Sequence, residues 1–285
     1  MSDVMTESTE NTIDTEKMTE NIENTTEEKT TEQSKNIKKS PKSKKKSHYH
    51  AVPPIKRSKS KDDSVHVTDE VFNTSSHLAG TIIAVLGTVL LILKAATGDY
   101  DDKPWRIVSF SVYGVTLILM FLCSTLHHGI NAKRSTEELF RLFDYFAIFP
   151  LIAGTFTPIC LVTLRSEPQW GWGTFGTIWG LAAVGIMIKA IFPKIPKWVT
   201  NTIYLSMGWI GIVLAIPFYL TVRETVGILP IVLLTLGGVF YTVGSAIFYG
   251  EWPNPVKGKF GFHEIWHIFV ILGAASHYLI MYFYI

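Results

Sequence analysis

The feature that most constrains this chain is a series of seven apolar blocks, each of roughly 18–22 residues, between residues 76 and 284. About 20 apolar residues in helical form cross the hydrocarbon core of a bilayer, and a helix satisfies its own backbone hydrogen bonds there. We therefore predict an all-α membrane protein, a seven-helix bundle within residues 67–285, and exclude a soluble domain. The blocks are 76–93, 107–127, 144–163, 174–192, 200–220, 228–248 and 264–284.

Residues 1–66 have a different composition, with no long apolar run. Residues 1–37 carry ten Asp and Glu against three Lys, and residues 38–61 carry ten Lys and Arg. Such a segment buries too little apolar surface to offset its ordering entropy, so we expect a disordered tail and no secretory signal. Its basic block either contacts anionic lipid headgroups or is simply solvated while fixing the orientation of the protein.

The distribution of basic residues predicts the orientation of the bundle. An odd number of spans places the two termini on opposite sides of the membrane. The connections on the side of the tail carry eight Lys and Arg with their flanks, and the other connections carry five. Because positive charge stays inside, we expect a cytosolic N-terminus, an external C-terminus and an integral, multi-pass protein of the plasma membrane.

Ionisable side chains within spans are costly and are usually functional. His128 ends the second block, Asp144 is expected in the first turn of the third, and His263 and His267 open the seventh. In the predicted topology all four lie at the same cytosolic depth. His263 and His267 are four residues apart and therefore share one helix face.

Three imidazoles from two helices suit a borderline-soft divalent ion such as Zn²⁺ and leave one coordination position open for water. We therefore predict a zinc site with His128, His263 and His267 as ligands. Asp144 is the candidate base that takes a proton from that water, and Ser124, four residues before His128, is the candidate for orienting water or ligand.

Several other polar residues have more than one interpretation. His127 points about 100° away from His128 and is interpreted as an interfacial residue. His277 lies about 15 Å along the helix from His267, and we expect a polar contact inside the bundle. Glu70, Asn73 and His77 share one helix face and either pack and cap that helix or surround the metal site. The stretch 154–158 (GTFTP) is expected to be a kink.

The segments EVFNTSSHLAG, SFSVYG, CSTLHHGI, LFDYFAIFPLIAGTFTP and FHEIWHIFVILGAASHY together resemble the haemolysin III proteins, a branch of the progestin and adipoQ receptor family. The resemblance covers residues from about 70 to 285. It implies a seven-helix fold with a cytosolic N-terminus and zinc held by His128, His263 and His267, with Asp144 and Ser124 close by. His127 stands where a tyrosine is common, and a shift of register would make it an alternative ligand.

The resemblance also implies an activity, because members similar to the adiponectin receptors hydrolyse lipid amides and distant relatives are alkaline ceramidases. The first hypothesis is thus a zinc-dependent hydrolase of lipid amides. The second is a receptor or regulatory protein with structural zinc, and the third is a lytic or pore-forming protein. We expect membrane lipids as partners and no nucleic acid, and two cysteines are too few for a cysteine-based zinc site.

Overall fold

The computed structural model describes Lys61, Ser64 and residues 69–285. The rest of the predicted tail lies outside the described residues. Within the described part of the chain, seven helices are long and apolar enough to cross a membrane, as expected, and an all-α bundle results. They are α2 (Glu70–Thr97), α3 (Lys103–Gly129), α4 (Arg134–Pro158) with its extension η1 (Ile159–Thr163), α5 (Gly171–Ile191), α6 (Lys197–Val226), α7 (Leu229–Gly250) and α8 (Phe262–Phe283).

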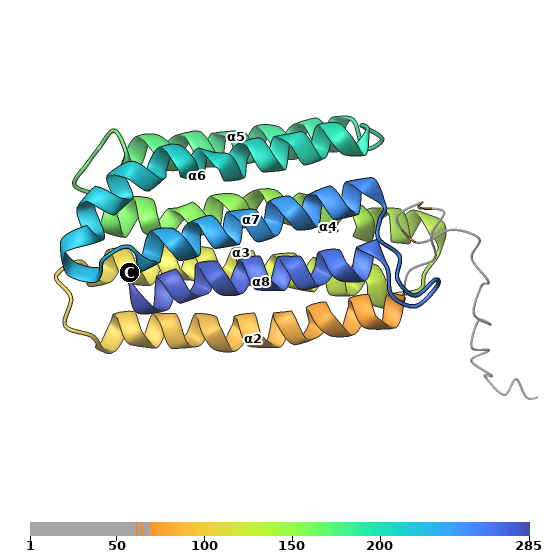
Figure 1. Ribbon diagram of the computed structural model, residues 1–285, viewed down its shortest axis with the longest axis horizontal. Coiled ribbons are helices and arrows are strands. Elements are labelled where there is room, and N and C mark those ends of the chain that lie inside the picture. The colour runs from red at the N-terminus through yellow and green to blue at the C-terminus, as the bar shows by residue number, and fades with distance from the viewer. Residues whose placement is uncertain (1–60, 62–63, 65–68) are drawn as a thin grey trace, which may run out of the picture. The chain divides into compact units, whose positions relative to one another are not determined.

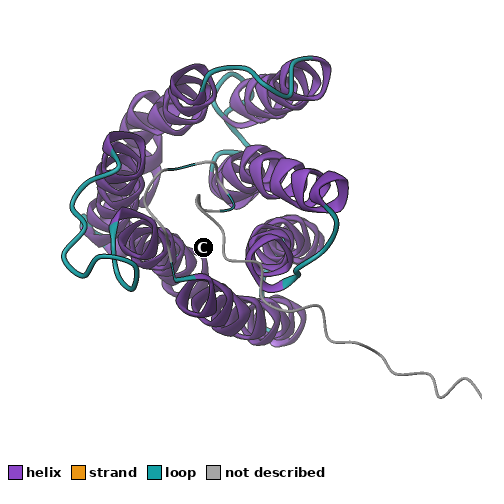
Figure 2. Cartoon of the chain, turned by 90° about the vertical axis from the view of Figure 1, so that its right-hand side faces the viewer, coloured by secondary structure: helices purple, strands orange, loops and turns teal. Residues whose placement is uncertain are grey.

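The helices lie alongside one another, and most pack against their neighbours in the sequence (Figures 1 and 2). Helix α8 packs against α2 as well as against α7, although α2 and α8 are far apart along the chain. Helix α3 in turn packs between α2 and α4. The C-terminal end of α3 and the N-terminal end of α8 therefore both lie beside the first turns of α2, and this brings the histidines of the two helices together.

Helices α2 and α4 begin well before their apolar blocks because their first turns are polar. Asp69 caps α2, and its carboxylate accepts hydrogen bonds from the backbone N–H groups of Val71 and Phe72. Helix α4 begins at Arg134, so Asp144 lies about three turns inside the helix and the expectation of a first-turn position is wrong. The segment 135–143 is rich in the good helix formers Glu, Leu and Arg, and apolarity alone does not detect it.

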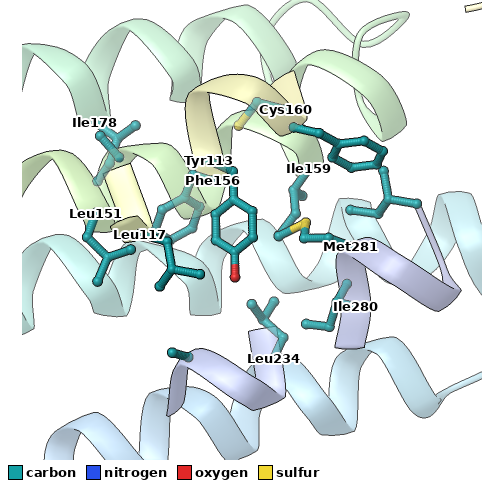
Figure 3. Packing of buried hydrophobic residues seen from close by; sticks show 14 of the residues in the cluster. Tyr113, Leu117, Leu151, Phe156, Ile159, Cys160, Ile178, Leu234, Ile280 and Met281 are labelled. Atoms are coloured by element: carbon teal, nitrogen blue, oxygen red, sulfur yellow. The ribbon is translucent and has the colours of Figure 1, made fainter. Parts of the chain in front are cut away.

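The stretch 154–158 ends the α-helical part of α4. Pro158 has no N–H to donate, and the chain continues from Ile159 to Thr163 as a π-helix, whereas the prediction for 154–158 was a kink. This region packs into the main apolar core, where side chains of α3, α4, α7 and α8 meet (Figure 3). The core includes Tyr113, Leu117, Leu151, Phe156, Ile159, Leu234, Ile280 and Met281. Close packing of this kind holds membrane helices together, since lipid supplies no hydrophobic driving force between them.

Candidate metal centre

Three buried histidines form a compact triangle at one end of the bundle. His128 lies in the last turn of α3, and His263 and His267 lie in the first turns of α8. Their ring centroids are 4.8 Å (His128–His263), 5.0 Å (His128–His267) and 5.0 Å (His263–His267) apart. Each ring offers a nitrogen, and these three atoms lie within 4.8 Å of one another. The structure thus brings together the three residues chosen as ligands.

Hydrogen bonds from α2 orient two of the three rings. Glu70 Oε2 lies 2.6 Å from His128 Nδ1, and Ser76 Oγ lies 3.3 Å from His267 Nδ1. With Nδ1 engaged in each case, Nε2 is the nitrogen that can coordinate an ion. Metal-binding histidines commonly have such a partner on the second nitrogen, which fixes the tautomer and the ring orientation. Glu70 is therefore part of the surroundings of the site, whereas the sequence left its role open and did not single out Ser76.

The other two residues of the Glu70 face have separate roles. The ring of His77 stacks on that of His267, with centroids 3.7 Å apart and planes at 17°, and meets Phe121 edge-on. The side-chain amide of Asn73 donates to Glu264 Oε1 at 3.1 Å. His77 thus supports a candidate ligand, and Asn73 joins α2 to α8. The sequence left open whether these residues surround the metal site or pack their helix. His77 does the first and Asn73 the second.

Glu264 is the residue that ties the starts of these two helices together. Its carboxylate is fully buried and accepts hydrogen bonds from the backbone N–H groups of Asp69 and Gly261 as well as from Asn73. Three donors on one buried carboxylate make a strong anchor, because charge-assisted hydrogen bonds offset the cost of burial. This anchor holds α8 against α2 directly beside His263 and His267.

Asp144 and His127 complete a second, overlapping group. Nitrogens of His127 and His128 and a carboxylate oxygen of Asp144 lie within 4.8 Å of one another. His127 is only 1% exposed, so the interpretation of an interfacial residue is wrong. Helix α3 packs against α2 on one side and α4 on another, so residues 100° apart on it both face protein. His127 contacts the ring of His128, with centroids 4.6 Å apart.

The segment before α2 contributes a cation to this end of the bundle. The ammonium group of Lys61 donates to the backbone carbonyls of His127, His128 and Ile130 at 2.9, 2.6 and 3.0 Å. These are the carbonyls at the C-terminal end of α3, where a positive charge is favourable. The hydroxyl of Ser64 donates to Glu251 Oε2 at 2.8 Å, in the connection before α8.

A cavity of about 230 Å³ extends from the histidines into the bundle. Ser124, Asp144, His263 and His267 line the end at the candidate site, and Leu234 and His277 line the other end. Between them the lining is mostly apolar and comes largely from α4, α6 and α7. Ser124 is buried and lies one turn before His128 on α3, which places its hydroxyl at the cavity and near the histidines.

The donor set fits a zinc ion. Three imidazoles with converging nitrogens match the ligand number of catalytic zinc sites, which keep one position open, and zinc favours imidazole over the oxygen-rich sites of calcium or magnesium. A carboxylate oxygen of Asp144 lies within 4.8 Å of a nitrogen of His128, so Asp144 lies next to this group of histidines.

Comparison with known proteins agrees with the fold and the motifs. Residues 65–278 match the family model described as haemolysin-III related. Hemolysin-3 of Bacillus cereus and the hemolysin-3 homolog of Bacillus subtilis are each 36% identical over 219 residues, covering 77% and 76% of this chain and 93% and 95% of those proteins. The human monocyte to macrophage differentiation factor is 27% identical over 221 residues, covering 75% of this chain and 83% of that protein. This chain is an integral membrane protein of the haemolysin-III related family.

Proposed function

We propose that this protein is a zinc-dependent membrane hydrolase that cleaves the amide bond of a lipid, such as a sphingolipid-like or other N-acyl compound. The observation that carries the proposal is the cavity. It is a mostly apolar space of about 230 Å³ that is lined at one end by Asp144, His263 and His267, and the two histidines converge there with His128. An apolar cavity with a few convergent polar groups at one end suits a ligand with a long chain and a reactive polar end.

The residues around the cavity have distinct tasks in this reaction. A zinc ion, when bound by His128, His263 and His267, supplies Lewis acidity to the amide carbonyl and to the attacking water. Asp144 accepts the proton of that water as its oxygen bonds to the carbonyl carbon. Asp144 then gives the proton to the amine nitrogen as the carbon–nitrogen bond breaks, so one water is consumed and an acid and an amine leave. The Ser124 hydroxyl orients the reacting groups.

The lining at the same end of the cavity supports a lipid headgroup there. Lys189, Lys197, Thr200, Asn201 and Ser245 all line it, and each lies at the end of its helix that is nearer to the metal centre. Lys189 also lies over the ring of Tyr145, with its nitrogen 4.7 Å from the ring centroid. Polar and cationic groups at one end and apolar groups along the rest match the two parts of an amphipathic lipid.

The experiment compares zinc content with hydrolysis in purified protein. We expect wild type to contain one zinc per chain and to release fatty acid from a panel of lipid amides. Asp144→Asn should retain the zinc and lose at least about 100-fold in rate, because proton transfer contributes about 10²–10⁴-fold. Asp101→Asn, in the exposed α2–α3 connection, is the matched control and should keep the full rate. Wild-type protein that contains zinc and hydrolyses none of the panel would contradict the proposal.

A structural role for zinc gives a different result. His263→Ala then loses the metal and unfolds at lower temperature, because the ion ties α3 to α8. If the zinc is catalytic instead, His263→Ala loses activity but stays folded. Its unfolding temperature then falls only by the amount expected when one bound ligand is lost. Hydrolysis by wild type excludes a purely structural ion.

Membrane lysis is the third hypothesis, and the names of the Bacillus relatives favour it. Dye leakage from liposomes separates it from hydrolysis. Leakage that persists in a His128→Ala, His267→Ala double variant would support lysis without the metal centre. Leakage that appears only with an amide lipid in the liposomes, and disappears in Asp144→Asn, would instead be a consequence of the hydrolysis.

A further inference from the structure

His277 lies at the end of the cavity remote from the metal centre. It follows His267 by ten residues on α8, which places it about 15 Å along the helix. Its side chain is 8% exposed and lines the cavity. The proposed reaction uses the other end, so it does not account for a buried imidazole at this depth. Ionisable side chains inside a membrane domain cost free energy and are usually functional, so we expect a specific role for this ring.

The hydrogen bonding of His277 defines what it offers to a ligand. Its Nε2 lies 3.3 Å from the backbone carbonyl oxygen of Leu234 on α7. A carbonyl oxygen only accepts, so Nε2 carries the proton, and in the neutral ring Nδ1 is then an acceptor. Nδ1 is buried and has no hydrogen-bond partner within the described part of the chain. The ring of His277 lines the far end of the cavity, and Nδ1 is its acceptor without a partner among the described residues.

The neighbouring residues keep the ring in this position. A Cβ on Gly237 would lie 3.0 Å from His277 Cε1 and closer still to Nε2, so only glycine allows the ring to approach α7 this closely. The ring of Tyr241 also contacts His277, with centroids 5.7 Å apart. The imidazole thus packs against α7 at Gly237 and Tyr241.

The apolar lining determines which donors can reach His277. Leu151, Phe156, Ile159 and Leu234 line the same cavity, and they admit a hydrocarbon chain. A charged donor such as an ammonium group would lose its hydration there at high cost, whereas a hydroxyl is neutral and donates one hydrogen bond. A ketone oxygen only accepts and gains nothing from a bare nitrogen. The chemistry at this point therefore selects a hydroxyl group on an otherwise apolar chain.

We propose that His277 is a specificity-determining residue that accepts a hydrogen bond from a hydroxyl group carried by the acyl chain of the substrate. The proposal rests on the proposed function, because it assumes that the amide carbonyl sits at the metal centre. Carbon–carbon bonds of about 1.5 Å in a zigzag advance about 1.3 Å each. A distance of about 15 Å then corresponds to a hydroxyl at about carbon 12 of the chain.

Binding to the purified full-length protein in lipid nanodiscs tests this proposal without requiring catalysis. The probes are three saturated fatty acids that carry at about carbon 12 a hydroxyl, a ketone or neither. We expect the hydroxylated acid to bind about five-fold more tightly than the unsubstituted acid, which is the usual worth of one hydrogen bond. The ketone should give no gain, and neither should a hydroxyl placed next to the carboxyl end.

Variants then assign the gain to the imidazole. In His277→Phe the advantage of the hydroxylated acid should disappear while the unsubstituted acid still binds. Ser276→Ala, on the neighbouring position of α8, whose hydroxyl donates to the backbone of Leu272, is the matched control and should keep the advantage. The comparison of the three acids on wild type gives a result even if His277→Phe fails to fold.

Two outcomes overturn the proposal: an equal gain from the ketone, or a hydroxyl gain that survives in His277→Phe. Failure of the proposed function looks different. A hydroxyl preference without hydrolysis of any amide would keep the role of His277 as a binding residue and remove the hydrolase. Hydrolysis with no preference among the three chains would keep the hydrolase and remove the role of His277.

Discussion

The hydrogen bond between Glu70 Oε2 and His128 Nδ1 is 2.6 Å long, shorter than the 3.3 Å contact between Ser76 Oγ and His267 Nδ1. A carboxylate on the second nitrogen fixes the ring and increases the basicity of the coordinating nitrogen. We expect Glu70→Ala to weaken zinc binding about 10- to 100-fold. Competition with a chromophoric chelator measures this change in purified protein.

Glu70→Gln is the informative companion, since it keeps an acceptor but removes the charge. Its zinc affinity should lie between those of wild type and Glu70→Ala. The matched control is Ser75→Ala, an exposed position of α2 whose hydroxyl donates only to the backbone of Val71. Zinc affinity in Glu70→Ala equal to that of the control would show that the carboxylate does not support the site.

At the scale of residues, the sequence revealed candidate ligands better than their surroundings. His263 and His267 are four apart, and His128 ends a span that predicted topology places at the same depth, so their meeting could be anticipated. The contact of Ser76 with His267 could not be anticipated, because it depends on how α2 is rotated about its own axis. His127 was misinterpreted for a related reason: an angle on a helix gives a direction, and only packing shows whether lipid or protein lies there.

At the scale of elements, the end of α3 depends on a residue outside the helix. Lys61 is only 8% exposed and donates to three carbonyls around the end of α3. Replacing it by methionine keeps the length of the side chain but leaves these acceptors without the ammonium group. We expect Lys61→Met to lower the free energy of unfolding by about 1–3 kcal/mol, measured by chemical unfolding in detergent micelles.

The control for this variant is Lys257→Met, which removes the same charge from an exposed position in the α7–α8 connection. It should change the free energy of unfolding by less than about 0.5 kcal/mol. Lys61→Arg should fall between the two methionine variants, since the charge is kept but the wider guanidinium must fit a buried position. If Lys61→Met is as stable as the control, the contacts with the α3 carbonyls contribute nothing to stability.

The apolar blocks predicted the existence and order of the helices, but not all of their limits. Hydropathy detects only the part of a helix that lies in hydrocarbon, and α4 begins with a polar segment about three turns long. Asp144 was therefore assigned to the wrong turn but to the right end of its apolar stretch. The sequence predicted a kink at 154–158 from its glycine and proline, but it did not predict the π-helix that follows Pro158.

At the scale of the whole molecule, the decisive contact is the one between α2 and α8, the first and last described helices. Topology gave the depth of each polar residue, but depth does not determine which helices lie side by side. Glu264 makes that contact specific, because its buried carboxylate takes donors from both helix starts. The sequence contained this residue without revealing its partners, since they are close in space and far apart along the chain.

The orientation of the bundle in the membrane remains a prediction from the segregation of charge. The connections α3–α4, α5–α6 and α7–α8, with their flanks, carry eight Lys and Arg against five for the others, so we expect them in the cytosol. In a variant with Cys123 and Cys160 replaced by alanine, an impermeant maleimide should label Asp101→Cys in intact cells. Lys257→Cys should react only after permeabilisation, which also controls for its accessibility. The opposite pattern would place the metal centre at the outer face and would require its lipid substrate to come from the outer leaflet.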